Sequence, residues 1–175
     1  MEHPHTESLF RFQPLGSAAR FTEEICDIVR DTPLFEQLSV QETRAMCGFM
    51  NCYAAVRGNV LIYEDEPGNS LLIVLTGRVA IVKRTQDGGS VRIGSAGPGE
   101  ALGEMSLVDG QHRFASCIAE EPVDFAVLTR AALNEILMLH PRLGNKILLL
   151  LLGHFSERLR HAIGAAMPQL VACAV

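Results

Sequence analysis

Apolar residues near both ends of the chain recur at steps of three and four, the spacing that places side chains on one face of an α-helix. The pattern covers residues 22–30 and 40–50 before the centre of the chain, and residues 130–139 and 141–164 after it. Ser39 and Glu42 stand three positions apart, as in a capping box. Thr129 is the expected N-cap of the third helix, and Pro141 suits the first turn of the final helix. We therefore expect helices on both sides of a central region.

The centre, at about residues 53–129, follows a different pattern. Short β-branched runs alternate there with glycine-containing turns, as is typical of β-strands. Asp87-Gly88-Gly89 lies between two such runs and predicts a hairpin. The runs are residues 60–63, 71–75, 78–83, 91–93, 114–119 and 123–128. Short strands at this spacing predict a mainly β region, either a sandwich or a jelly-roll barrel, with flanking helices.

The two ends of the chain show no clear period. The first segment contains prolines and several apolar residues, so it predicts an irregular arm that docks on the domain or on a partner. The last segment contains Pro168 and predicts a fraying tail. The expected division is an N-terminal arm at 1–20, a domain at 21–164 with its barrel at about 53–129 and C-terminal helices at about 130–164, and a tail at 165–175.

Composition narrows the classes of function. The formal net charge is −5, whereas nonspecific nucleic-acid binders normally carry a basic face. A hydrophobic content of 48% in 175 residues is enough for one domain with a buried core. The five cysteines contain no C-x-x-C pair and indicate reduced, buried thiols. No targeting signal is visible, and the longest aliphatic run, residues 147–152, is too short to cross a membrane, so we expect a cytoplasmic protein.

The candidate chemistry lies in residues 98–118. Gly103 and Glu104 open a short turn, and Arg113 follows nine positions after the glutamate. A carboxylate only accepts hydrogen bonds and suits a sugar hydroxyl, whereas a guanidinium is a planar, permanently charged fork that suits phosphate oxygens. A short helix that opens here offers free backbone N–H groups to the same anion. This order of residues predicts a ligand that carries both a hydroxyl pair and a phosphate.

Two motifs in this stretch resemble the phosphate-binding cassette of the cyclic-nucleotide-binding domain. Residues 102–107 read LGEMSL and residues 113–117 read RFASC, against family patterns of F-G-E-x-(A/S)-L and R-(A/S/T)-A-(S/T)-(V/A). Further matches are Gly58, the turn at residues 63–68 and Gly77-Arg78-Val79, and the resemblance extends from about residue 33 to about residue 160. The family includes catabolite-activator-type bacterial regulators, the regulatory subunit of cyclic-AMP-dependent kinase and cyclic-nucleotide-gated channels. The resemblance implies a β-jelly-roll (double-stranded β-helix) barrel with N-terminal helices and a C-terminal helix that serves as a lid or a dimer seam.

The resemblance also implies a role for each residue of the cassette. Glu104 is expected to accept a hydrogen bond from the ribose 2′-hydroxyl, and Arg113 is expected to pair with the cyclic phosphate. Gly103 would let the chain approach closely, while the backbone N–H groups of Met105 and Ser106 would point at the phosphate. Each role has a purely structural alternative: Glu104 could be a solvated glutamate of the turn, and Arg113 could form a surface salt bridge. The predicted binding residues are Gly103, Glu104, Met105, Ser106, Arg113, Phe114, Ala115 and Ser116.

Phe114 departs from the family pattern, in which a small or hydroxyl residue follows the arginine. In several members a hydroxyl at this position contacts the base, and phenylalanine cannot make such a bond. Its ring either stacks on the purine, walls it off or occupies the pocket itself. Ser116 keeps a hydroxyl two positions later, either as a ligand contact or as a strand serine bonded to the backbone.

The final helix is expected to cover the base, with His154, Phe155 and Arg158 as candidates for the capping residue. The aliphatic residues 147–152 either pack entirely within the chain or form a homodimer through a second apolar face. No room is left after this helix for the helix-turn-helix that follows the domain in the bacterial activators. The resemblance therefore implies a stand-alone sensor that acts on a separate effector protein and does not bind nucleic acid directly.

Two functions are consistent with these patterns. The first is a regulatory protein that binds a cyclic mononucleotide, with cyclic AMP favoured over cyclic GMP, and signals by repositioning helices toward a partner. The alternative is a degenerate domain that binds no nucleotide and serves as an interaction or dimerisation scaffold, a reading that Phe114 favours. The sequence shows no nucleophile–base pair and no metal-ligand set, so we expect neither an enzyme nor a metal or cofactor site.

Overall fold

The computed structural model describes residue 9 and residues 11–173, and every structural statement below concerns these residues. Residues 1–8 and 10, which form much of the predicted N-terminal arm, lie outside the described residues.

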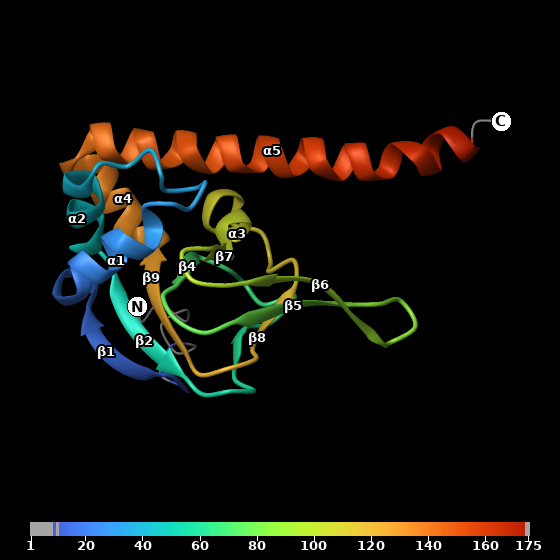
Figure 1. Cartoon of the computed structure of the whole chain (residues 1–175), viewed down its shortest axis with the longest axis horizontal. Coiled ribbons are helices and arrows are strands. Elements are labelled where there is room, and N and C mark those ends of the chain that lie inside the picture. The colour runs from blue at the N-terminus through green and yellow to red at the C-terminus, as the bar shows by residue number, and fades with distance from the viewer. Residues whose placement is uncertain (1–8, 10, 174–175) are drawn as a thin grey trace.

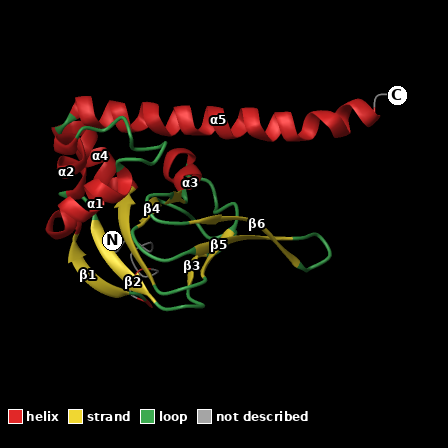
Figure 2. Ribbon diagram, viewed as in Figure 1, coloured by secondary structure: helices red, strands yellow, loops and turns green. Residues whose placement is uncertain are grey.

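Two antiparallel sheets form the centre of the molecule (Figures 1 and 2). The five-stranded sheet contains β1 (Gln13–Ser17), β2 (Asn51–Ala55), β9 (Val123–Thr129), β4 (Ser70–Val74) and β7 (Ala101–Leu102), in that order. The four-stranded sheet contains β3 (Val60–Ile62), β8 (Ser116–Ala119), β5 (Val79–Arg84) and β6 (Ser90–Ala96), in that order. From β2 to β5 and from β6 to β9 consecutive strands alternate between the two sheets, and the arrangement is a β-jelly-roll with flanking helices, as the sequence predicted.

The helices lie at one end of the sheets and along one side of them (Figure 1). They are the short 3₁₀ helix η2 (Ala18–Phe21), α1 (Thr22–Val29), α2 (Val40–Cys47), α3 (Glu104–Asp109), α4 (Arg130–Leu139) and α5 (Pro141–Cys173). Figure 1 shows that α5 runs over α3 and continues well beyond the sheets. The hairpin of β5 and β6 projects in the same direction below it.

Strand β4 separates two hydrophobic cores, because all five of its residues are buried. Successive side chains of a strand point to opposite faces. Leu71 and Ile73 therefore pack with the helices, whereas Leu72 and Val74 pack between the two sheets. Burial of each such side chain contributes about 1.5–3 kcal/mol of hydrophobic stabilisation. The two cores fix β4 between the helices and the four-stranded sheet.

Several local predictions are confirmed. The side chain of Ser39 accepts a hydrogen bond from the backbone N–H of Glu42, and the Glu42 carboxylate accepts one from the backbone N–H of Ser39, which completes the capping box. Thr129 caps α4 by accepting a hydrogen bond from the backbone N–H of Ala132. Pro141 is the first residue of α5, and Asp87-Gly88-Gly89 lies in the β5–β6 hairpin.

The structure differs from the sequence prediction at both ends. Residues 13–17, predicted as part of an irregular arm, form β1, which pairs with β2 and is interrupted by a bulge between Pro14 and Gly16. An edge strand tolerates a proline because it lacks a neighbour on one side. Helix α5 continues through Pro168 to Cys173 instead of ending near residue 164. A proline removes a single intrahelical hydrogen bond, and here the helix persists on both sides of it.

The four described cysteines whose side chains are placed, Cys26, Cys47, Cys52 and Cys117, are buried free thiols. Burial raises the pKa of the Cys47 and Cys117 thiols to about 12. Across the described residues, none of the helices combines the length and the apolar character needed to cross a membrane.

Candidate functional site

Helix α3 begins directly after Gly103, whose φ of 78° lies in the left-handed region. A Cβ atom at this position would lie 2.2 Å from Nη1 of Arg113, so both the conformation and the space require glycine. Gly68 faces the same guanidinium, because a Cβ atom there would lie 2.6 Å from its Nε. The two glycines therefore let the backbone close around the Arg113 side chain.

The Arg113 side chain is buried and held by three hydrogen bonds. Its Nη1 donates to the carbonyl oxygens of Ser70 and Gly103, at 2.8 Å and 2.9 Å, and its Nη2 donates to Oγ of Ser70 at 2.9 Å. These bonds use three of the five guanidinium N–H groups, and the other two have no acceptor among the described residues. Burial lowers the pKa of Arg113, while nearby acidic groups that include Glu104 oppose the shift. The result is a cation fixed in place with two donors to spare.

The backbone of Arg113 is fixed as well. Its N–H donates to the carbonyl of Glu66 at 2.8 Å, and its own carbonyl accepts from the N–H of Asp65 at 2.9 Å. Asp65 adopts a φ of 65°, a conformation uncommon for a residue other than glycine. The turn between β3 and β4 thus sets the position of Arg113 before any ligand is present.

Glu104, the first residue of α3, has a carboxylate that is nearly inaccessible to solvent. Its Oε1 accepts a hydrogen bond from Nη1 of Arg158, a residue of α5 whose side chain is half exposed. One carboxylate thereby joins the start of α3 to the long C-terminal helix. Together Glu104, Arg113 and Arg158 carry a net charge of +1, which complements an anion of charge −1.

Arg130, the first residue of α4, holds α3 in place through a hydrogen bond to its backbone. Its Nη2 donates to the carbonyl of Ser106 at 2.8 Å, and its backbone N–H donates to the carbonyl of Asn69 at 2.7 Å. The guanidinium lies against Gly110, the C-cap of α3, where a cation also suits the negative end of the helix dipole. Asn69 directly precedes Ser70, which accepts hydrogen bonds from Arg113. Arg130 therefore contacts both α3 and the start of β4, the two segments that hold the site.

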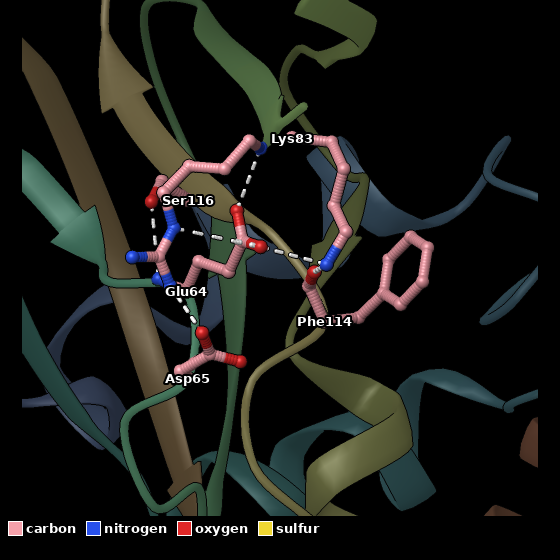
Figure 3. A network of polar contacts seen from close by, with 6 residues as sticks. Glu64, Asp65, Lys83, Phe114 and Ser116 are labelled. Atoms are coloured by element: carbon pink, nitrogen blue, oxygen red, sulfur yellow. Dashed lines mark hydrogen bonds and ion pairs between the residues drawn. The ribbon is translucent and has the colours of Figure 1, made fainter. Parts of the chain in front are cut away.

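Figure 3 shows a second polar network around Phe114. Nζ of Lys83 donates to Oε1 of Glu64 and to the carbonyl of Phe114, both at 2.7 Å, and lies 4.5 Å from the centroid of the Phe114 ring. The Lys83 hydrogen bond is the main cause of the lowered pKa of Glu64, and a hydrogen bond from the backbone N–H of Arg84 adds to it. The N–H of Glu64 donates to Oγ of Ser116 at 3.0 Å. The side chain of Phe114 is thus held while remaining exposed.

Glu104, Arg113, Phe114 and Arg158 line a small pocket with a cavity volume of about 70 Å³. Seven of the eight predicted residues line it, and Ser116 does not, since its hydroxyl faces the backbone of Glu64. The lining consists of Ile62, Ile81, Ala101, Leu102, Gly103, Glu104, Met105, Ser106, Arg113, Phe114, Ala115, Cys117 and Arg158. We call Gly103 and the buried residues Glu104, Ser106 and Arg113 the floor, and the pair Phe114 and Lys83 the rim.

The sequence does not predict the contacts that two residues, Arg158 and Ser70, make with the floor. The sequence indicates Arg158 only as a candidate to cap the base, and its contact with Glu104 spans 54 positions of the chain. Ser70 lies 43 positions before Arg113, and no spacing rule connects the two. Only the apolar period of α5 gave an indirect signal, because it predicted a long helix that passes near the site.

Residues 55–140 match the family model described as the cyclic nucleotide-binding domain. A crystal structure of a cyclic nucleotide-binding domain from Methylobacillus flagellatus KT is 41% identical in sequence, covers 95% of this chain and is covered to 97%, with a TM-score of 0.82. The "Cyclic AMP receptor protein" of Thermus thermophilus is 30% identical over 77% of this chain and 60% of its own length. The "cAMP-dependent protein kinase regulatory subunit" of Mycosarcoma maydis is 30% identical over 60% of this chain and 20% of its own length.

The chain therefore belongs to the cyclic-nucleotide-binding domain family, as the cassette motifs indicated. It spans no more than 60% of the length of these two curated relatives, so the family assignment concerns this domain.

Proposed function

We propose that this protein is a cytoplasmic regulatory module that binds a cyclic mononucleotide, with cyclic AMP favoured over cyclic GMP. The observation that carries the proposal is the buried Arg113, which keeps two guanidinium N–H groups without an acceptor among the described residues and lines the same pocket as Glu104. Arg113 would bind the cyclic phosphate with these groups. Since Arg158 occupies Oε1 of Glu104, the other carboxylate oxygen would accept the ribose 2′-hydroxyl. The names of the relatives that bind or respond to cyclic AMP support this ligand.

Gly103, Met105 and Ser106 would act mainly through their backbone. Gly103 allows close approach, and the N–H groups of Met105 and Ser106 lie in the first turn of α3, where helix donors lack intrahelical partners. Ala115 is small and buried in the pocket wall, so it leaves space for the ligand. A contact between Ser116 and the ligand stays a prediction, because its hydroxyl is engaged by Glu64.

The contact between Glu104 and Arg158 suggests how binding would reach α5. A ribose hydroxyl that shares the Glu104 carboxylate changes the energy of the Arg158 contact, and thereby the position that α5 prefers. A separate effector protein would then recognise the repositioned helices. The signal depends only on the difference in ligand affinity between the two positions of α5.

The exposed face of α5 supports a homodimer. Leu149, Leu152, Leu159 and Ile163 are exposed and separated by three, seven and four positions, as in the seam of a coiled coil. A second copy of α5 would cover them. In sedimentation experiments we expect Leu159→Lys to shift a dimer of the protein to a monomer, with Arg160→Lys as the matched control on the same turn.

A degenerate scaffold is the second candidate. One observation favours it: Arg113 and Glu104 already have partners within the chain, namely Ser70, Gly103 and Arg158. In that case these contacts would be purely structural, and the protein would act through its surface.

Isothermal titration of the folded, nucleotide-free protein with cyclic AMP and cyclic GMP distinguishes the two candidates. We expect binding in the micromolar range, about 8 kcal/mol, that Arg113→Ala abolishes. Arg92→Ala is the matched control, because Arg92 forms an exposed pair with Glu120 and does not line the pocket. If the wild-type protein binds neither nucleotide, the receptor proposal fails and the scaffold remains.

A further inference from the structure

The rim of the pocket carries an aromatic ring whose orientation is set within the chain. Phe114 is 54% exposed, although a large apolar side chain gains free energy from burial. It lines the same pocket as the buried Arg113 and Glu104. An exposed ring at the opening of a polar pocket is a candidate contact for a ligand that is charged at one end and flat and apolar at the other.

Lys83 fixes the ring from one side (Figure 3). Its Nζ lies over the ring and also donates to the carbonyl of the same residue, so it contacts both ends of Phe114. The ammonium is held in turn by Glu64, whose second carboxylate oxygen accepts from the N–H of Arg84 at 2.9 Å. The position of the ring is therefore determined before a ligand arrives, and little side-chain entropy remains to be lost on binding.

Part of the ring remains available to a ligand, because Phe114 lines the pocket and is 54% exposed. Lys83 and Ile81 are two positions apart on β5, so both side chains point to the same face of the sheet, and Ile81 lines the pocket. Phe114 and Ile81 give this side of the pocket an apolar surface, whereas the floor supplies the charges. Phenylalanine has no hydrogen-bonding group, so it can recognise a base only through its face.

We propose that Phe114, held by Lys83, is the base-stacking residue of the site and selects purine over pyrimidine bases by the area of ring contact. This inference rests on the proposed function, since it assigns the base of the same ligand. Stacking of a base on an aromatic side chain has an effect of about tenfold or more on affinity. The larger purine ring system covers more of the phenyl face than a pyrimidine does.

The test compares Phe114→Leu, which keeps apolar volume but removes the aromatic face, with Phe114→Tyr, which keeps that face. Binding of cyclic AMP and cyclic UMP is measured by titration calorimetry. We expect the wild-type protein to bind cyclic AMP about tenfold more tightly than cyclic UMP, and Phe114→Leu to lose most of this preference through weaker binding of cyclic AMP. Phe114→Tyr should retain it. Phe49→Leu is the matched control, because Phe49 does not line the pocket.

A spectroscopic readout separates stacking from a structural role. In NMR spectra, the ring current of Phe114 should move the adenine H2 and H8 signals of bound cyclic AMP upfield in the wild-type protein and in Phe114→Tyr, and not in Phe114→Leu. If Phe114→Leu binds both nucleotides like the wild-type protein, with unchanged adenine shifts, the stacking role is refuted while the proposed function stands. If the wild-type protein binds no cyclic nucleotide, the proposed function is refuted and this inference with it.

Discussion

The floor and the rim of the pocket are built in opposite ways. Glu104 and Arg113 of the floor are 4% and 7% exposed and are held by β4, α5 and the turn before β4. Phe114 of the rim is 54% exposed and is held by one lysine. A buried charge without partners is costly, so each floor residue needs its whole set of hydrogen bonds. The rim carries no such requirement, which explains why this chain can keep the family motif in the floor and depart from it at Phe114.

This contrast assigns different tasks to the two regions. In the proposed function, the floor offers charges of fixed position and would determine the class of ligand, a phosphate joined to a hydroxyl-bearing sugar. The rim offers an apolar face and would determine which base is preferred. Changes in the floor should abolish or strongly weaken all binding, whereas changes at the rim should alter selectivity.

Among the conservative substitutions, the largest effect is expected for Arg113→Lys. Lysine keeps the charge, but it cannot bind Ser70, Gly103 and a phosphate at the same time, because it lacks the planar fork. Loss of the two charge-assisted bonds to the phosphate should weaken cyclic AMP binding by about 100-fold. Titration calorimetry measures this change. Binding within threefold of the wild-type protein would show that charge alone suffices and that the fixed geometry of the floor has no role.

A smaller effect is expected for Glu104→Gln. The amide still contacts the ribose hydroxyl but loses the charge, so binding of cyclic AMP should weaken about tenfold. The same change removes the ionic contact with Arg158, and hydrogen exchange of the α5 amides near residue 158 should become faster.

Arg158→Gln provides the comparison for this prediction. It should accelerate exchange in α5 to a similar extent, while the uncharged side chain leaves the Glu104 carboxylate for the ligand. If neither variant changes exchange in α5, the contact between Glu104 and Arg158 does not connect the floor to the helix.

Arg130→Gln tests whether α4 supports the floor. Loss of the arginine side chain should let α3 shift, since glutamine is too short to reach the carbonyl of Ser106 and pack against Gly110. We expect binding of cyclic AMP to weaken about threefold, with no change in the preference for cyclic AMP over cyclic UMP. A change in base preference instead would mean that α4 influences the rim. Arg92→Gln is the distant control with the same type of substitution.

The floor was more predictable from the sequence than the rim. Glu104 and Arg113 lie within ten residues of each other and Gly103 is adjacent, so a local motif contained most of the floor. Ser70 and Arg158 come from distant segments, and their contacts depend on how β4 and α5 pack. The network of Lys83 and Glu64 joins β5 to the turn after β3, and a single sequence gives no signal for such a pairing.

The same distinction applies to the fold. The helices and the long β-branched strands were predicted because their patterns are local. Strands β1, β2 and β7 were missed because Gln13–Ser17 and Asn51–Ala55 have no strong alternation and Ala101–Leu102 has only two residues. Their strand geometry comes from pairing with strands distant in sequence: β1 pairs with β2, β2 with β9, and β7 with β4.

The smallest effect is expected from Glu64→Gln, which loosens the rim without touching the floor. Hydrogen bonds from Lys83 and from the backbone of Arg84 hold the pKa of Glu64 below its ordinary value of 4.5. A carboxylate with a lowered pKa stabilises the fold above that ordinary value, and the contribution disappears as the pH falls through the lowered pKa.

Because Lys83 is partly exposed, we expect Glu64→Gln to lower Tm by only about 2 °C at pH 7. The difference in Tm between the two proteins should shrink as the pH falls below 4.5 and vanish once the pH lies below the lowered pKa of Glu64. Thermal unfolding at pH 7 and at a series of lower pH values measures this difference, and binding of cyclic AMP at pH 7 should weaken less than threefold, since the floor is unchanged. A larger loss of affinity would show that the floor depends on the rim and that the two regions do not act separately.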